Sequence, residues 1–474
     1  ASCSSGPSGF LPSSTLPWVS VPSLTSDPYS HRAIWAIALP MIVSSVSVPL
    51  VGLVGTGVLG NLDDNAYLAA VAAAVQVFSI LFVGLNFLRM GTTGITAQAH
   101  GSLARDAGAS TAIRQSLGEA VIVALVLGVI IIALQVPIRN AAFGVIGAEP
   151  EVTRYAYQYF DIRVWSAPAT LFNFVALGWL LGMQNARGPL AITLVLNLTN
   201  VALDLWFVLG LGLKVRGVAT GALLAEIAGA ATAAWMLRGE LQRYPGSWSG
   251  TRLLDLRSYR ALLKINGNLF IRTLALMFTF AFVTVQGARL GTVYLAANAL
   301  LMNFQWLTAY ALDGIANAAE ALVGKAVGAR DREGMLRTVR RTLAWSLGFG
   351  ALFSLVFWVA GPAIVRTLTS LPDVRATALE YLPWMIFLPL ISVWSFFYDG
   401  VYVGATLSRE MRVVMTTTAF LVFLPVWFIT RDLGNHGLWL AFTAFMILRG
   451  LGMHLWFNRL KETLVPDRTM ERTA

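Results

Sequence analysis

The fifteen residues Ala120-Val-Ile-Val-Ala-Leu-Val-Leu-Gly-Val-Ile-Ile-Ile-Ala-Leu134 contain no charged side chain. An α-helix rises 1.5 Å per residue, so about 20 apolar residues cross a hydrocarbon core of about 30 Å. Apolar stretches of about this length recur from Ile34 to Leu460, and we count twelve of them. The pattern predicts an all-α integral membrane protein with twelve transmembrane helices.

The composition supports a membrane protein and excludes several other classes. The chain is 57% hydrophobic and 12% charged with a mean hydropathy of +0.68, whereas soluble proteins are about 25% charged. The net charge of +10 lies in small groups along the loops, which argues against nucleic-acid binding. One Cys and four scattered His give no disulfide framework and no metal-ligand spacing. No convergent catalytic set is visible, so we expect neither an enzyme nor a cofactor or metal site.

The loops differ in their content of basic residues. With a cytoplasmic N-terminus, the inner segments hold 22 of the 34 Lys and Arg residues and the outer loops hold 8. Short cytoplasmic loops are enriched in Lys and Arg. We therefore expect both termini in the cytoplasm.

The longest basic loop, Arg238 to Lys264, divides the predicted spans six and six. Around it we expect a disordered Ser- and Pro-rich tail (1–30), a six-helix N-terminal lobe (31–238), a basic cytoplasmic linker (239–264), a six-helix C-terminal lobe (265–460) and a cytoplasmic tail (461–474).

The two halves echo one another. Gly101 and Gly328 follow the second and eighth spans at an offset of 227, and Trp206 and Trp427 lie in the fifth and eleventh spans at an offset of 221. Six is an even number, so two such copies share one orientation and form a parallel pseudo-two-fold repeat with a substrate site between the halves. Chance matching in so biased a composition is the alternative.

The first span contains two prolines, Pro40 and Pro49, which have no backbone N–H to donate to the helix. Each proline predicts a kink that neighbouring helices can compensate in a membrane. The first span is therefore our candidate for a bending helix.

A lone acid, Asp204, lies within the fifth predicted span. Charged side chains at bilayer depth are costly and serve by default as candidates for ion or substrate handling. Asn197 and Asn200 precede Asp204 by seven and four residues, so the three side chains share one helix face. Such a face suits proton binding. Asp161 and Glu226 could line the same cavity.

Asp161 also has a structural interpretation, which is an ion pair with Arg163 or Arg154 near the surface. The second half carries four charges within its spans, namely Arg272, Asp313, Glu320 and Asp399. Buried charges must be paired, so we interpret them as a structural charge cluster. A cation or substrate site at Asp399 or Asp313 is the alternative.

Several motifs resemble those of a known transporter family. They are Ala38-Leu-Pro40-Met, the run from Val48 to Gly60, Leu88-Arg-Met-Gly-Thr-Thr-Gly94, Ser166-Ala-Pro168, Gly178 to Gln184, Asn197 to Asp204, Phe270-Ile-Arg-Thr273 and the run from Ala296 to Gly324. Together they resemble the DinF-type branch of the multidrug and toxic compound extrusion (MATE) family of the MOP superfamily. The resemblance implies two lobes arranged as a V, alternating access, and export of cationic or amphipathic compounds in exchange for protons or sodium.

The resemblance also assigns residues. Asp204 and Asn200 match polar positions used by the proton-coupled branch, and Asp399 resembles the tenth-helix acid of the sodium-coupled branch. The family's first helix usually carries an acid where this chain has Gly55. Asp204 acting alone, substitution by Asp161, and impaired transport are the three consequences left open.

We therefore expect a proton-driven efflux antiporter, monomeric and in the bacterial inner membrane, whose partners are the bilayer and a cationic or amphipathic small molecule. Gln76, Trp165, Asn173 and Gln184 are the expected lining of its substrate cavity. The alternatives are a sodium-coupled exporter, a transport-impaired relative, and a flippase for lipids or lipid-linked saccharides. A flippase would favour a strongly cationic cavity for phosphate headgroups, whereas these spans hold more acids than bases.

Overall fold

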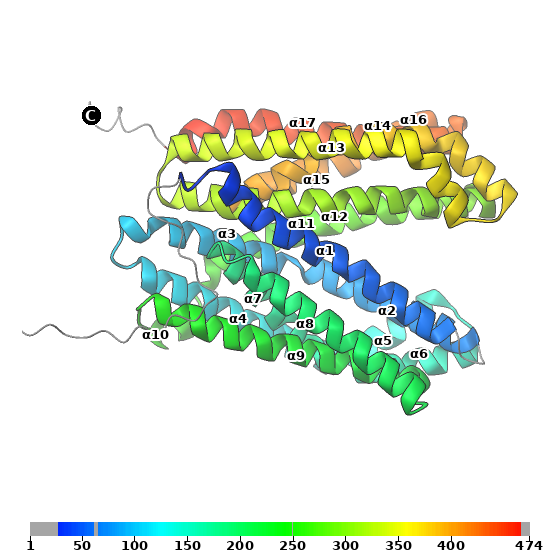
Figure 1. Ribbon diagram of the computed structural model, residues 1–474, viewed down its shortest axis with the longest axis horizontal. Helices are drawn as coiled ribbons and strands as arrows, with labels where there is room; N and C mark the ends of the chain where they lie inside the picture. The colour runs from blue at the N-terminus through cyan, green and yellow to red at the C-terminus, as the bar shows by residue number, and fades with distance from the viewer. Residues whose placement is uncertain (1–26, 61–64, 249, 466–474) are drawn as a thin grey trace, which may run out of the picture.

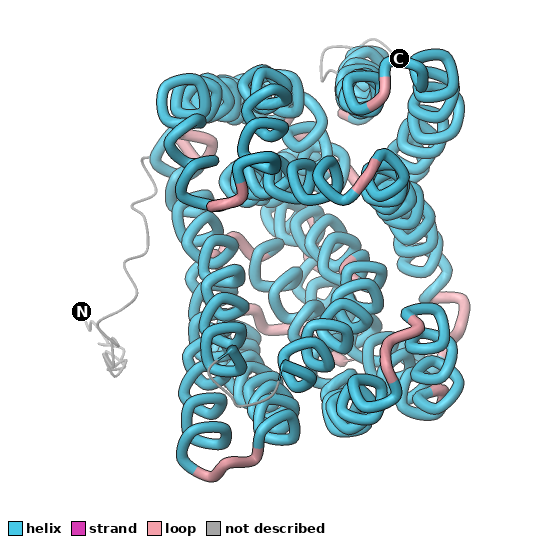
Figure 2. The backbone as a smooth tube through the Cα atoms, turned by 90° about the vertical axis from the view of Figure 1, so that its right-hand side faces the viewer, coloured by secondary structure: helices cyan, strands magenta, loops and turns pink. Residues whose placement is uncertain are grey.

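The computed structural model describes residues 27–60, 65–248 and 250–465, and all regular secondary structure within these residues is helical. Most helices follow one common direction, which Figure 2 views nearly end-on. The described chain begins and ends at the same end of the molecule, on the left of Figure 1. The prediction of an all-α fold is confirmed.

The predicted spans of the first half contain more breaks than the hydropathy suggested. The helices are α1 (His31–Gly60), α2 (Asn65–Leu85), α3 (Phe87–Gly101), α4 (Ala109–Ala133), α5 (Gln135–Ile146), α6 (Pro150–Arg163), α7 (Ala167–Gly182), α8 (Arg187–Asp204) and α9 (Lys214–Arg243). Asn86 separates α2 from α3, and Leu134 separates α4 from α5. A 3-10 turn joins α6 to α7, where Pro168 occupies the first turn of α7, a position that tolerates its missing N–H.

The first span is one uninterrupted helix. α1 continues from His31 to Gly60 with Pro40 and Pro49 inside it. The two prolines therefore do not end the helix, and bending at them stays a prediction. α1 packs against both α8 and α12 (Thr292–Gly328), so it contacts helices from the two halves of the sequence.

The second half begins earlier than predicted. Its remaining helices are α10 (Gly250–Leu254), α11 (Tyr259–Leu290), α13 (Arg332–Leu368), α14 (Pro372–Gly404), α15 (Ser408–Thr418), α16 (Leu424–Thr430) and α17 (Asn435–Leu464). The expected linker 239–264 thus contains the end of α9, all of α10 and the start of α11. Of the expected tails 1–30 and 461–474, the described parts contain the end of α17, which reaches Leu464, and Tyr29, which is 5% exposed. Residues 1–26 and 466–474 lie outside the described residues.

Within the described part of the chain, eleven helical stretches are long and apolar enough to cross a membrane. The predicted eighth span, which α12 contains, is not among them. Its apolar character is diluted by amides and acids such as Asn298, Gln305, Asn317 and Glu320, all of which are buried. A helix surrounded by other helices needs little apolar surface, because side chains rather than lipid cover it.

The two halves repeat the same close helix contacts. A Cβ atom at Gly101 would overlap with the carbonyl of Lys325, and one at Gly328 would overlap with the carbonyl of Gln98. Only glycine lets α3 and α12 approach so closely at their ends. The sequence echo of Gly101 and Gly328 therefore corresponds to one reciprocal helix crossing.

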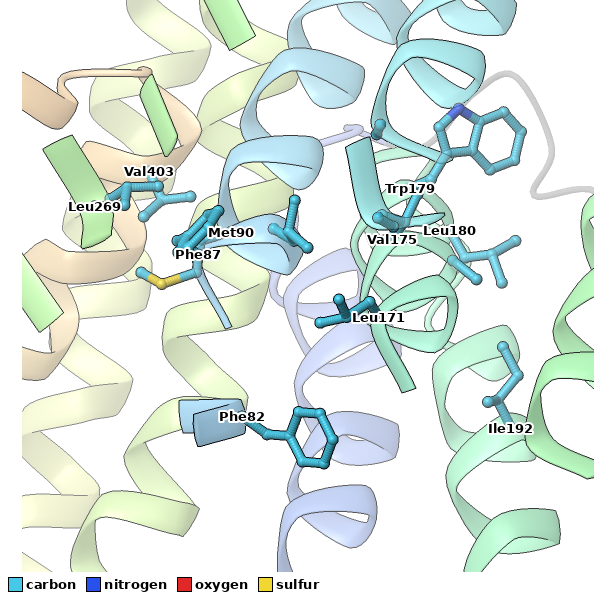
Figure 3. Packing of buried hydrophobic residues seen from close by; sticks show 14 of the residues in the cluster. Phe82, Phe87, Met90, Leu171, Val175, Trp179, Leu180, Ile192, Leu269 and Val403 are labelled. Carbon is cyan, nitrogen blue, oxygen red and sulfur yellow. The ribbon is translucent and has the colours of Figure 1, made fainter. Parts of the chain in front are cut away.

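The largest apolar core cluster surrounds α7. Figure 3 shows Trp179, Leu171 and Val175 of α7 in this cluster, and the indole Nε1 of Trp179 donates to the carbonyl of Ile113 at 3.1 Å. The same cluster includes Leu269 of the second half. Packing is therefore continuous between the halves, and this core positions the polar helix faces described next.

Candidate functional site

A cavity of about 510 Å³ lies where the first half meets α12. Most of its wall comes from α1, α2, α6, α7 and α8. Its lining includes the polar, aromatic and charged residues Ser44, Ser45, Phe78, Ser79, Phe82, Arg89, Tyr159, Arg163, Phe174, Thr193, Tyr310, Asp313 and Asn317. Binding cavities for small molecules are commonly apolar with a few placed polar groups. The size and lining therefore suit an amphipathic small molecule.

Three charged side chains line this cavity. Arg89 of α3 donates from Nη1 to Oδ1 of Asn317 at 2.9 Å and lies 3.9 Å from Oε2 of Glu320. Arg163 of α6 forms an ion pair of its own, described below. Asp313 of α12 is exposed to the cavity, and no hydrogen bond or ion pair joins it to another described residue. Asp313 is thus the acid that a positively charged ligand in the cavity would meet.

Asp204 is buried, with 3% of its surface exposed, at the end of α8. Its Oδ1 accepts one hydrogen bond, from Nδ2 of Asn200 at 3.3 Å. A Cβ atom at Gly221 of α9 would lie 2.5 Å from the same oxygen, so the carboxylate rests directly on the backbone of α9. The i, i+4 spacing of Asn200 and Asp204 predicted this contact.

The polar face of α8 continues along the helix against α1. Nδ2 of Asn197 donates to Oγ of Ser47 at 2.8 Å, and Oγ of Ser44 donates to Oγ1 of Thr193 at 2.9 Å. This face thus leads from Asp204 to the cavity wall at Ser44 and Thr193. It forms a row of polar groups between α8 and α1.

A second buried acid lies on α9 beside this face. Oε1 of Glu226 accepts from Nη2 of Arg163 at 3.0 Å, and Oε2 accepts from Nδ2 of Asn173 at 2.9 Å. Nη1 of Arg163 donates to the carbonyl of Ala222 and to Oγ of Ser166. Glu226 is therefore fixed by a cation and an amide, unlike Asp204.

Asp161 lies apart from these groups. Both of its carboxylate oxygens accept from Nη1 of Arg139 at 2.8 Å, and the Asp161 side chain is 47% exposed. The expected partners were Arg163 and Arg154, but Arg163 pairs with Glu226 and Arg154 pairs with Glu151. The physical reason is the break after Leu134, which forms α5 and brings Arg139 over α6.

The predicted charge cluster of the second half forms around Asp399. Its Oδ2 accepts from both Arg272 of α11 and Arg449 of α17. Arg449 is 1% exposed and Arg272 is 7% exposed. Glu320 instead faces Arg89, and Asp313 faces the cavity, so the four predicted residues do not form one closed cluster.

The four residues predicted to line a substrate cavity do not line the cavity described above. Gln76 is exposed, and Trp165 is 57% exposed at the turn between α6 and α7. Asn173 is buried against Glu226. Gln184 accepts from Nζ of Lys325 at 3.1 Å, where the two halves meet.

Gly55 lies in the last two turns of α1. Apart from its chain neighbours and the backbone of its own helix, no described residue has a heavy atom within 4 Å of a Cβ placed there. A side chain at this position therefore has open space, and the missing acid leaves no imprint on the packing.

Sequence reasoning missed the partners of three arginines. Arg89, Arg163 and Arg449 were recognisable as basic residues within spans, and a buried base requires an acid. The available signal was the presence of buried acids in other spans. Spacing could not assign the pairs, because each base and its acid lie on different helices and 50 or more residues apart. No group of three or more His, Cys, Asp or Glu in the described residues could hold a metal ion.

A family model and individual known proteins are both similar to this chain. A family model described as MatE matches residues 40–206 and 269–429. The DNA damage-inducible protein F of Escherichia coli K12 is 42% identical over 435 residues, which cover 91% of this chain and 92% of that protein. A probable multidrug resistance protein NorM of Thermotoga maritima is 25% identical over 450 residues, covering 91% and 92%.

A solved structure has the same fold. It is described as the outward-facing conformation of a multidrug resistance MATE family transporter of the MOP superfamily. The two structures superpose with a TM-score of 0.83 at 19% sequence identity, covering 93% of this chain and 98% of that one.

Proposed function

Because the chain belongs to the MatE family of efflux transporters, which are not enzymes, we propose that it exports cationic or amphipathic small molecules in exchange for protons, with Asp204 as the proton carrier. The observation that carries this proposal is the environment of Asp204. Among the described residues, its buried carboxylate has one amide partner at 3.3 Å and no cation at ion-pair distance. A buried acid without a cation is stabilised by taking up a proton, and it releases that proton when a conformational change admits water.

The architecture of the proposal follows from the helix arrangement. With α12, the predicted eighth span, added to the eleven other stretches, we propose twelve crossings in two six-helix lobes related by a parallel pseudo-two-fold axis, with both termini in the cytoplasm. The reciprocal crossing at Gly101 and Gly328 supports this repeat. The protein then works as a monomer in the bacterial inner membrane, and substrate binds in the cavity between α12 and the first lobe.

Proton coupling accounts for the acids better than sodium coupling does. The tenth-helix acid, Asp399, is held by Arg272 and Arg449. A sodium ion at Asp399 would lie beside two guanidinium groups, and like charges at such distances repel. Asp313 remains available in the cavity for the cationic group of a substrate.

The cavity also argues against the flippase alternative. Its two arginines, Arg89 and Arg163, both face acids, namely Glu320 and Glu226. No unpaired cation of the described wall is left for a phosphate headgroup, whereas Asp313 is left for a positive charge.

The test is proton-gradient-driven movement of a fluorescent organic cation in vesicles that contain the purified protein. We expect Asp204→Asn to abolish exchange while the protein elutes from size-exclusion chromatography as the wild type does. Asp432→Asn is the matched control, because its side chain is 92% exposed, and it keeps wild-type exchange. Normal exchange by well-folded Asp204→Asn would overturn the proposal.

Gly55→Asp separates the remaining possibilities in the same assay. The open space at this position lets the variant fold. Wild-type exchange that Gly55→Asp does not increase means that Asp204 acts without a first-helix acid. Exchange that begins only with Gly55→Asp would mean that the chain has lost proton coupling.

A further inference from the structure

α9 brings three charged residues to one place. The carboxylate of Asp204 rests on α9 at Gly221, where a Cβ atom would lie 2.5 Å from its Oδ1. The next residue, Ala222, accepts from Nη1 of Arg163 at 2.8 Å. Glu226, one helical turn later, accepts from Nη2 of the same arginine at 3.0 Å. One arginine therefore lies beside two carboxylates from different helices.

The charges of these three residues do not balance when all are ionised. Asp204 and Glu226 are 3% and 7% exposed, and the side chain of Arg163 is 14% exposed. An unpaired buried charge is strongly unfavourable, and the single positive charge of Arg163 can neutralise only one of the two carboxylates. In this structure the guanidinium is on Glu226, which also accepts from Asn173, and Asp204 has the neutral amide of Asn200. This arrangement fits an Asp204 that carries a proton.

Resting on the proposed proton coupling, we propose that Arg163 is a positioning residue that alternates between Glu226 and Asp204. It pairs with Glu226 while Asp204 is protonated and shifts toward Asp204 when the proton leaves. Among the described helices packed around Asp204, Arg163 and Tyr159 of α6 interact electrostatically with it, and Glu226 of α9 pairs with Arg163. The facing part of α1 contributes serine hydroxyls.

The shift connects proton release to the substrate cavity. Arg163 lines the cavity, so its movement changes the charge that a bound cation meets. Nη1 of Arg163 also donates to Oγ of Ser166 at 3.1 Å, in the turn that joins α6 to α7. A guanidinium drawn toward Asp204 weakens this bond and frees the turn. Proton loss at α8 is thereby transmitted both to the cavity wall and to the joint between two helices.

The test measures the exchange rate as a function of pH in vesicles for Glu226→Gln and for the double variant Arg163→Gln with Glu226→Gln. In Glu226→Gln, Asp204 is the one carboxylate left to pair with the guanidinium of Arg163. The pH midpoint of exchange therefore moves down by about 1 unit or more. In the double variant Asp204 has no cation, and the midpoint moves up. Glu240→Gln is the matched control, because Glu240 pairs with Arg243 on the same helix at 2.9 Å, and it keeps the wild-type midpoint.

Opposite shifts distinguish a positioning role from a structural one, because a merely structural pair would lower the amount of folded protein without moving the midpoint. Arg163→Lys, which keeps the charge, should stay within about half a pH unit of the wild type. Wild-type midpoints in both glutamine variants, together with inactive Asp204→Asn, would overturn this inference and leave the proposed function intact. Active Asp204→Asn would overturn the proposed function itself.

Discussion

Asp204 is a buried aspartate of the first half, Asp399 is a partly buried aspartate of the second half with 13% of its side chain exposed, and their surroundings differ sharply. Asp204 accepts one hydrogen bond from an amide, at 3.3 Å from Asn200. Asp399 accepts from two guanidinium groups, those of Arg272 and Arg449, which are 9% and 2% exposed in their side chains. The same residue type is thus left without a cation in one half and given an excess of cations in the other.

The two acids differ in what the loss of their negative charge would do to neighbouring residues. Protonating Asp399 would leave two buried arginines without an anion, which costs several kcal/mol. Protonating Asp204 breaks no ion pair and relieves the burial of a negative charge. The surroundings of Asp204 are therefore compatible with the proton exchange proposed above, whereas Asp399 pairs with two arginines.

The largest expected effect tests this difference through stability. Asp399→Asn should lower the free energy of unfolding by about 3 to 5 kcal/mol, because it leaves two buried cations without a partner. Asp204→Asn should change it by less than about 1 kcal/mol, because only an amide contact is replaced. Thermal unfolding of both variants in the same detergent measures the contrast.

Arg449→Gln sharpens the same comparison, because Arg272 remains to pair with Asp399. We expect a smaller loss of stability than in Asp399→Asn. Equal melting temperatures for Asp399→Asn and Asp204→Asn would show that the two acids are equivalent after all.

The contrast between these acids also marks how far the sequence could be interpreted. Apolar runs predict helices directly, and the 3.6-residue period placed Asn197, Asn200 and Asp204 on one face, because these facts lie within one helix. The resemblance to the DinF-type branch is confirmed by the relatives. The 3.6-residue period predicts which face of a helix is polar, but it does not predict which other helix packs against that face.

The pairing of Asp399 with Arg449 therefore depends on tertiary packing of α14 and α17, and the pairing of Arg163 with Glu226 depends on that of α6 and α9. The same limit explains α12. Its amides made it a weak apolar span by composition, but its burial by neighbouring helices comes from the assembled bundle. The lining of the cavity, assembled from seven separate segments of chain, was likewise beyond the reach of spacing.

Another prediction concerns a feature that the two halves share, the close crossing of α3 and α12 at Gly101 and Gly328. Gly101→Val and Gly328→Val should each lower the free energy of unfolding by about 1 to 3 kcal/mol, because each side chain would overlap with a backbone carbonyl of the other helix. Gly239→Ala is the control, since no described atom beyond its chain neighbours and its own helix backbone lies within 4 Å of its Cβ position, and it should be neutral or stabilising by up to about 1 kcal/mol. Melting temperatures check all three. A loss for only one of the two valine variants would contradict the reciprocal crossing.

The smallest expected effect concerns an acid that also has two arginines but lies outside the membrane-spanning segments. Asp27 pairs with Arg341 at 2.8 Å and Arg337 at 3.3 Å, and its side chain is 31% exposed. The hydrogen bond from Arg341 is the largest cause that holds the pKa of Asp27 below its ordinary value of 3.8. Water and salt screen such pairs, so Asp27→Asn should cost less than about 1 kcal/mol at neutral pH.

The sign of the pH dependence follows from this lowered pKa. The stability contributed by Asp27 is present above the pKa of the unfolded chain and is lost as pH falls through the lower pKa of the folded state. The melting-temperature difference between wild type and Asp27→Asn should therefore stay constant from pH 7 to about 5, shrink below about pH 4, and also shrink at high salt. The deficit of Asp399→Asn should persist at high salt, because its arginines are buried. A large, salt-insensitive loss of melting temperature in Asp27→Asn would contradict this comparison. It would mean that pairing with two arginines is enough to make an aspartate important for stability, and that burial of the arginines does not explain the difference between Asp399 and Asp27.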